Sequence, residues 1–324
     1  MVTIALLMRF IGASWQTSIR TAAVMYVGAV LIGALCWPSI APAEPFGIVS
    51  AGNFDGGGIV RLLALAFLSG LFAYFIAWPV GKQIAVLAAP AGLAVWSIRS
   101  GSMANLMQAN STLDARMAIL AKLRWESFFW LAVVLAGFAG VYLASKITRP
   151  KKQKDGGAEE QRKIFGTEGF SADFKKLKAG IGNINILTAI FGSGVIAVLI
   201  ILQLARGERF YDERLGYLIG QPDKGQITFA IITGFAGAGF AVKKFLGLSF
   251  FWSVLAVPVT AVFVSFIYAS RATVEHITAS WPAIFFANSM VAILPIELVS
   301  FGTLGAILGY LMAVRYEYWR QYES

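Results

Sequence analysis

Two glutamates are the residues of this 324-residue chain whose positions best suit chemistry. Glu126 and Glu297 each stand at the start of a long apolar segment, and Glu297 lies inside LPIELVSFG, between apolar neighbours. Burying a charge among apolar residues is costly, so carboxylates in such segments are often functional, and one at this depth could carry a proton. The simpler interpretation, which we favour, is a carboxylate at a helix start that the helix dipole stabilises.

Two further pairs of residues recur at a fixed spacing. Pro90 and Pro258 each interrupt an apolar segment, and paired interruptions of this kind point towards the binding site in transporters. Paired kinks also serve helix packing, so both interpretations stay open. Asp55 and Asp223 lie in the turns GNFDGGG and GQPDKGQ, where we expect them to begin helices rather than to bind calcium or phosphate.

The remaining sequence offers little for catalysis or metal binding. One cysteine, Cys36, and one histidine, His276, argue against disulfide frameworks, thiolate clusters, bis-histidine haem and zinc sites. The sequence contains no Ser/His/Asp motif, no HExxH and no CxxC, which gives hydrolysis and redox chemistry little support. We therefore predict no enzyme activity, no cofactor and no metal.

The composition is that of a membrane protein. Hydrophobic residues make up 58% of the chain and charged residues 14%, and the mean hydropathy is +0.70. A soluble domain carries about 25% charged residues. Two apolar segments, 84–98 and 227–242, are short and broken by Pro or Gly, and six others approach or exceed the length that a bilayer span needs: 21–40, 62–80, 126–145, 181–205, 250–269 and 298–314. We predict an all-α polytopic membrane protein with about eight transmembrane helices.

An internal repeat divides these eight segments into two sets of four. VLAAP at 86–90 returns as VLAVP at 254–258, an offset of 168 residues, and the same offset aligns Asp55 with Asp223 without a gap. Because four spans is an even number, both halves would enter the membrane in the same direction, as parallel repeats. The predicted units are a first four-helix repeat at 1–145, a basic cytoplasmic linker at 146–180 and a second four-helix repeat at 181–324.

The distribution of Lys and Arg predicts the orientation. If the N-terminus lies inside, the excess of basic residues falls on the cytoplasmic side, so we predict N-in and C-in. Anionic lipid headgroups account for this basic face, and no nucleic acid is needed. The Gly- and Ala-rich composition favours a bacterial inner membrane. The residues expected to contact headgroups are Lys151, Lys152, Lys154, Lys175, Lys176, Lys243, Lys244, Arg315 and Arg320.

One basic patch, formed by Arg116, Lys122 and Arg124, falls on the predicted outer side. The segment 110–125 has apolar residues at helical spacing, and Ser111 with Asp114 forms a capping box. We expect an amphipathic helix that lies in the outer membrane interface.

Two functions fit this sequence, and both stay open. The first is a carrier or channel that moves a small or lipidic solute at the interface between the repeats, with Glu126, Glu297, Pro90 and Pro258 near its path. The alternative is a non-catalytic subunit that anchors a larger membrane complex, with other membrane subunits or a second copy as partners. A membrane enzyme acting on lipid would need a polar cluster that the sequence does not reveal.

Overall fold

The computed structural model describes residues 15–42, 47–78, 81–148, 183–205, 207–280 and 286–322. Most of these residues are helical, and seven helices among them are long and apolar enough to cross a membrane. An eighth span results if one bent pair, Lys82–Arg99 with Met103–Ala109, is counted as a single crossing. The chain is therefore a multi-pass membrane protein, as the composition predicts.

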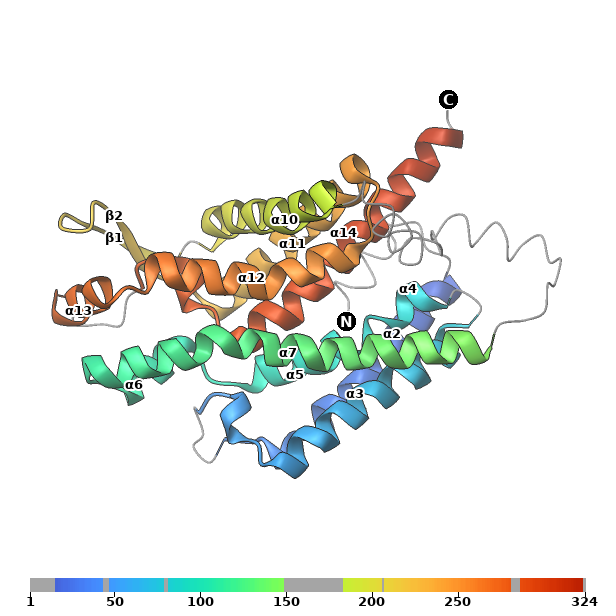
Figure 1. Cartoon of the computed structure of the whole chain (residues 1–324), viewed down its shortest axis with the longest axis horizontal. Helices are drawn as coiled ribbons and strands as arrows, with labels where there is room; N and C mark the ends of the chain where they lie inside the picture. The colour runs from blue at the N-terminus through green and yellow to red at the C-terminus, as the bar shows by residue number, and fades with distance from the viewer. Residues whose placement is uncertain are drawn as a thin grey trace.

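The N-terminal helices, α2 to α7, pack as one group (Figure 1). Helix α2 runs on into a π-helical segment, η1, and α3 and α7 lie against each other. Their bounds are α2 (Trp15–Gly28), η1 (Ala29–Ala34), η2 (Trp37–Ser39), η3 (Ala51–Asn53), α3 (Gly56–Ala77), α4 (Lys82–Ala85), α5 (Ala88–Arg99), α6 (Met103–Ala109) and α7 (Leu113–Ile147).

The C-terminal helices, α10 to α14, form the second group and include a small β-hairpin that the all-α prediction missed. Strands β1 and β2 pair antiparallel from Glu208 opposite Gln221 to Asp212 opposite Tyr217. Gly216 takes the positive φ of 70° that the tight turn requires. The bounds are α10 (Asn183–Leu204), β1 (Glu208–Asp212), β2 (Tyr217–Gln221), α11 (Lys224–Leu246), α12 (Phe250–Tyr268), α13 (Arg271–Ser280), η4 (Ser289–Ala292) and α14 (Pro295–Tyr322).

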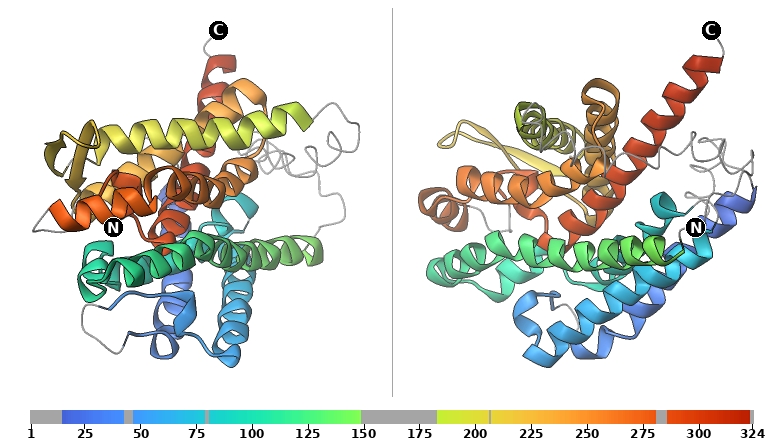
Figure 2. Two further views of the ribbon diagram at one scale, coloured as in Figure 1. Left: turned by 60° about the vertical axis from the view of Figure 1, so that its left-hand side comes forward. Right: turned by 45° about the vertical axis from the view of Figure 1, so that its right-hand side comes forward.

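Helix α14 lies between the two groups, as both views in Figure 2 show. It packs against α11 and α12 of its own group and against α5 and α7 of the other. Membrane helices associate through close packing, which small residues allow. A Cβ atom at Gly309 would overlap the backbone carbonyl of Ala236 on α11, and one at Gly305 would overlap that of Ile232. Glycine therefore sets how closely α11 and α14 approach.

Within the predicted segment 110–125, the residues from Leu113 onwards are helical. They form the first turns of α7, which continues without a break to Ile147. The N-cap is Thr112, whose Oγ1 accepts the Ala115 N–H, and not Ser111. Leu120 and Leu123 of this segment are buried in the core of the protein, whereas Leu113 and Met117 are only partly buried.

The two prolines interrupt their helices to different degrees. Helix α12 continues through Pro258, whereas α5 begins at Ala88, two residues before Pro90, after a break that separates it from α4. The apolar segment around 84–98 is therefore a broken one, as the sequence indicated, and the segment 227–242 is part of a continuous helix of 23 residues. Asp55 and Asp223 are the N-caps of α3 and α11, as the turns predicted.

Replacing Gly309 with alanine tests the close packing of α11 and α14. Because the new methyl group would overlap backbone, we expect Gly309→Ala to lower the free energy of unfolding by about 1–3 kcal/mol. Gly192→Ala in α10 is the matched control, since its Cβ would meet no atom within 4 Å. Thermal unfolding in one detergent measures both, and equal stability of the two variants would contradict the packing argument.

Candidate functional site

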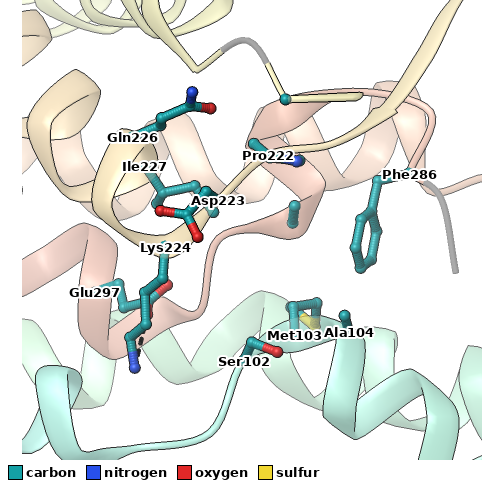
Figure 3. A pocket seen from close by; sticks show the side chains of 12 residues that line it. Ser102, Met103, Ala104, Pro222, Asp223, Lys224, Gln226, Ile227, Phe286 and Glu297 are labelled. Atoms are coloured by element: carbon teal, nitrogen blue, oxygen red, sulfur yellow. Dashed lines mark ion pairs between the residues drawn. The ribbon is translucent and has the colours of Figure 1, made fainter. Parts of the chain in front are cut away.

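A cavity of about 450 Å³ lies between the two helix groups at the end of the molecule that carries the hairpin (Figure 3). We call this end, with the starts of α11 and α14 and the connection 100–112, the hairpin end. One wall is the start of α6, and the opposite walls are the start of α11 and the segment before α14. The polar and aromatic residues that line the cavity are Ser102, Asp223, Lys224, Gln226, Phe286 and Glu297.

An ion pair between Lys224 and Glu297 lies at this cavity. Lys224 Nζ is 3.7 Å from Glu297 Oε1, and it also donates to the carbonyl oxygens of Ser100 (2.6 Å) and Ile98 (3.3 Å). Those two carbonyls belong to the C-terminal end of α5, so one ammonium group joins α5, α11 and α14. The pair therefore connects the two helix groups.

Glu297 is buried but incompletely hydrogen-bonded. Its exposed fraction is 2%. Oε2 accepts the N–H of Leu294 (3.2 Å), which is the half of a capping box that a glutamate in the first helical turn provides. Oε1 is buried and accepts no hydrogen bond within the described residues, although Lys224 is nearby. The helix-start interpretation of this carboxylate holds for one oxygen, and the other remains open to a ligand or water.

Glu126 occupies a different environment. It lies several turns inside α7 rather than at a helix start, and its exposed fraction is 6%. Three donors satisfy it: Ser50 Oγ (3.0 Å), Ala51 N–H (2.8 Å) and Trp130 Nε1–H (3.0 Å). Because its acceptors are engaged within the N-terminal helices, Glu126 is well suited to fixing the start of α3 against α7. It does not line the cavity, and Pro90 and Pro258 lie buried away from the cavity wall.

The basic patch on the predicted outer side makes contacts within the protein. Arg116 donates to Thr278 Oγ1 (2.7 Å), and Arg124 donates to Ser265 Oγ (3.2 Å) and stacks over Phe266. These contacts reach from α7 to α13 and α12, and an exposed pair between Arg271 and Asp114 (3.1 Å) spans the same gap. Together with Lys224 they join the two helix groups at the hairpin end.

A second polar cluster holds the hairpin against α13. His276 Nε2 is 2.8 Å from Asp212 Oδ2, and Nδ1 is 3.2 Å from Ser280 Oγ and 3.4 Å from Arg214 Nη1. The sequence shows no Ser/His/Asp motif because His276 is 64 residues from Asp212. Ser280 ends α13, and the carbonyl end of a helix disfavours the negative charge of an acyl-transfer intermediate. The geometry therefore favours a structural role.

The basic residues predicted to contact lipid headgroups fall into two sets. Lys243 pairs with Glu317 (3.2 Å) and Lys244 lies over the Tyr316 ring, so both lysines of α11 contact the end of α14. Arg315 lies over the Trp319 ring, one turn further along α14. Arg320 lies in the same last turns of α14. Lys151, Lys152, Lys154, Lys175 and Lys176 lie outside the described residues.

Lys224 is the site residue that the sequence analysis overlooked. It is the first residue of α11, where the helix dipole disfavours a cation. That conflict is a signal in the sequence: a lysine directly after a predicted N-cap aspartate requires a partner from elsewhere. Its partners, Glu297 and the carbonyls of α5, lie far away in the sequence.

Comparison with known protein families, with curated proteins and with solved structures found no match.

The ion pair can be tested by a double-mutant cycle. Lys224→Met leaves the Glu297 carboxylate buried without its cation, so we expect it to destabilise the protein more than Glu297→Gln does. In the double variant no charge is left unpaired, and part of the loss returns, with a coupling energy of about 0.5–3 kcal/mol. Thermal unfolding measures the cycle, and additive effects would contradict the contact.

Proposed function

We propose that this membrane protein is a carrier or channel that binds a small solute in the cavity between its two helix groups. One observation carries the proposal: Glu297, buried on the cavity wall, has an oxygen without a hydrogen bond, and its ion-pair partner Lys224 holds the two groups together. A solute that engages this carboxylate would compete with the contact between the groups. Binding and relative movement of the groups are then coupled. We propose no catalytic step.

The internal repeat is part of this proposal, and several contacts recur in a way that supports it. The third span of each group packs against the last span of the other, α5 on α14 and α12 on α7. The N-caps Asp55 and Asp223 are 168 residues apart. In the first group, a Cβ at Gly92 of α5 would crowd Gly28 of α2. In the second group, a Cβ at Gly194 of α10 would crowd Thr260 of α12, and Thr260 lies 168 residues after Gly92. Such reciprocal packing is expected of two parallel repeats.

In the proposed orientation the hairpin end faces outwards and the linker faces the cytoplasm, which in a bacterium places the protein in the inner membrane. The cavity then opens to the external side. The basic residues at the opposite end would lie near anionic headgroups, to which each contributes about 1 kcal/mol.

Single cysteines test this topology in a Cys36→Ala background. Asn53→Cys and Glu213→Cys are exposed at the hairpin end of the two groups, and we expect both to react with an impermeant thiol reagent added outside intact cells. Gly157→Cys in the linker should react only after the membrane is permeabilised. If Asn53→Cys and Glu213→Cys label from opposite sides, the parallel repeat is wrong.

Transport can be tested in proteoliposomes without knowing the solute. The panel is methylammonium, acetate, glycine, glycerol, phosphate, sodium and a fluorescent phospholipid. We expect at least one to cross faster with the protein than without it. Glu297→Gln should slow that flux by about tenfold or more, because a hydrogen bond to a charged group is lost. Glu126→Gln is the matched buried control and should retain the flux.

The alternative, a non-catalytic subunit of a larger membrane complex, is favoured by two results together. No solute in the panel crosses faster with the protein than without it, and native mass spectrometry of gently extracted protein shows a stable hetero-complex. Flux that is unchanged in Glu297→Gln would overturn the role of this carboxylate and leave carrier function itself in place.

A further inference from the structure

We propose that the ligand of the cavity is a small cation with N–H donors, an ammonium ion or a small primary amine. This inference rests on the proposed function, because it names the solute class that the same cavity would accept. The hydrogen-bonding groups on the cavity wall differ in whether they are already engaged, and that difference indicates which ligand the wall can accept.

The only ammonium group on the described wall, that of Lys224, faces three acceptor groups. A lysine ammonium carries three donors. At Lys224 two of them meet the Ser100 and Ile98 carbonyl oxygens, and the Glu297 carboxylate lies 3.7 Å away on a third side. An anionic solute would have to displace one of these partners to reach the charge. The lysine is therefore a structural cation and a poor receptor for an anion.

Both carboxylates on the wall keep acceptor capacity, and the Gln226 amide adds an acceptor and two donors. Glu297 Oε1 faces Lys224 at 3.7 Å but accepts no hydrogen bond. The exposed Asp223 uses Oδ2 to accept the Gly225 N–H (2.8 Å), which leaves Oδ1 as a further acceptor. The Ser102 hydroxyl is engaged with Asn105, since it donates to Oδ1 (3.1 Å) and accepts the backbone N–H (3.2 Å). Open acceptors require a ligand that brings donors.

The charge and shape of the wall agree with a cation. Two carboxyl groups and one ammonium group line the cavity, and the ammonium group is already paired with one of the carboxyl groups. Phe286 lines the opposite side, where an aromatic face attracts a cation within about 6 Å of the ring (Figure 3). Glu297, which is buried, attracts a cation more strongly than a carboxylate in bulk solvent would, whereas Asp223 is exposed.

Binding is measured on the full chain in nanodiscs with three probes of similar size: methylammonium, acetate and acetamide, at one ionic strength. We expect methylammonium alone to raise the midpoint of thermal unfolding, by an amount that grows with the logarithm of its concentration above Kd. Glu297→Gln should weaken its apparent affinity roughly 10- to 100-fold, because a charge-assisted hydrogen bond is lost.

Asp223→Asn provides a second variant that should fold normally, since asparagine caps helices as well as aspartate does. We expect it to weaken methylammonium binding too, whereas Asp55→Asn, the same change at the N-cap of α3, should leave it unaltered. Equal effects of the two substitutions would overturn the assignment to this cavity.

The outcomes separate this inference from the proposed function. Stabilisation by acetate or acetamide, but not by methylammonium, overturns the cation assignment and leaves the carrier proposal standing. Methylammonium binding that depends on Glu297 and Asp223, without flux of any solute, supports the site and overturns transport. If none of the three probes binds, the inference is wrong, and the flux panel then decides the proposed function independently.

Discussion

Direct contact between helix backbones is the constraint on which this structure depends. Lipid is as apolar as leucine, so apolar side chains alone do not hold membrane helices together, and close packing must do so. At Gly140 a side chain would overlap the carbonyl of Phe67 on α3, and at Gly309 it would overlap the carbonyl of Ala236 on α11. The same device joins α2 to α5, where Gly28 lies against Ala88. These contacts fix the helix positions, and the polar groups are arranged around them.

The two buried carboxylates show how similar sequence settings can lead to different chemistry. Glu126 receives three donors from its own helix group, and this satisfied network fixes the start of α3 against α7. Glu297 receives one backbone donor and a lysine that already contacts two carbonyls. A fully satisfied carboxylate is an anchor, whereas a partly satisfied one beside a cavity has capacity for a ligand. We therefore expect a ligand at Glu297, in the second half of the chain, and not at Glu126.

The sequence alone predicted the membrane class, most of the spans and the helix-starting role of Asp55 and Asp223, because hydropathy and capping are local properties. It also identified Glu297. It missed Lys224 because the partners of that residue come from α5 and α14, and side-chain geometry across a fold is not written in local patterns. The contact that holds the hairpin against α13 was missed because His276 is 64 residues from Asp212. The apolar period at 110–125 predicted a helix but did not predict that Leu120 and Leu123 pack in the protein core, since periodicity does not distinguish protein from lipid as a partner.

The position of α14 has a consequence for the order of assembly. This helix contacts spans of both groups, yet it follows all of them in sequence, so every one of its neighbours is synthesised before it. While α14 is still absent, the small-residue face of α11 and the end of α5 have no partner from it, and Lys224 has no carboxylate. Both the ion pair and the part of the cavity wall formed by Glu297 therefore depend on the helix that is synthesised after all its neighbours.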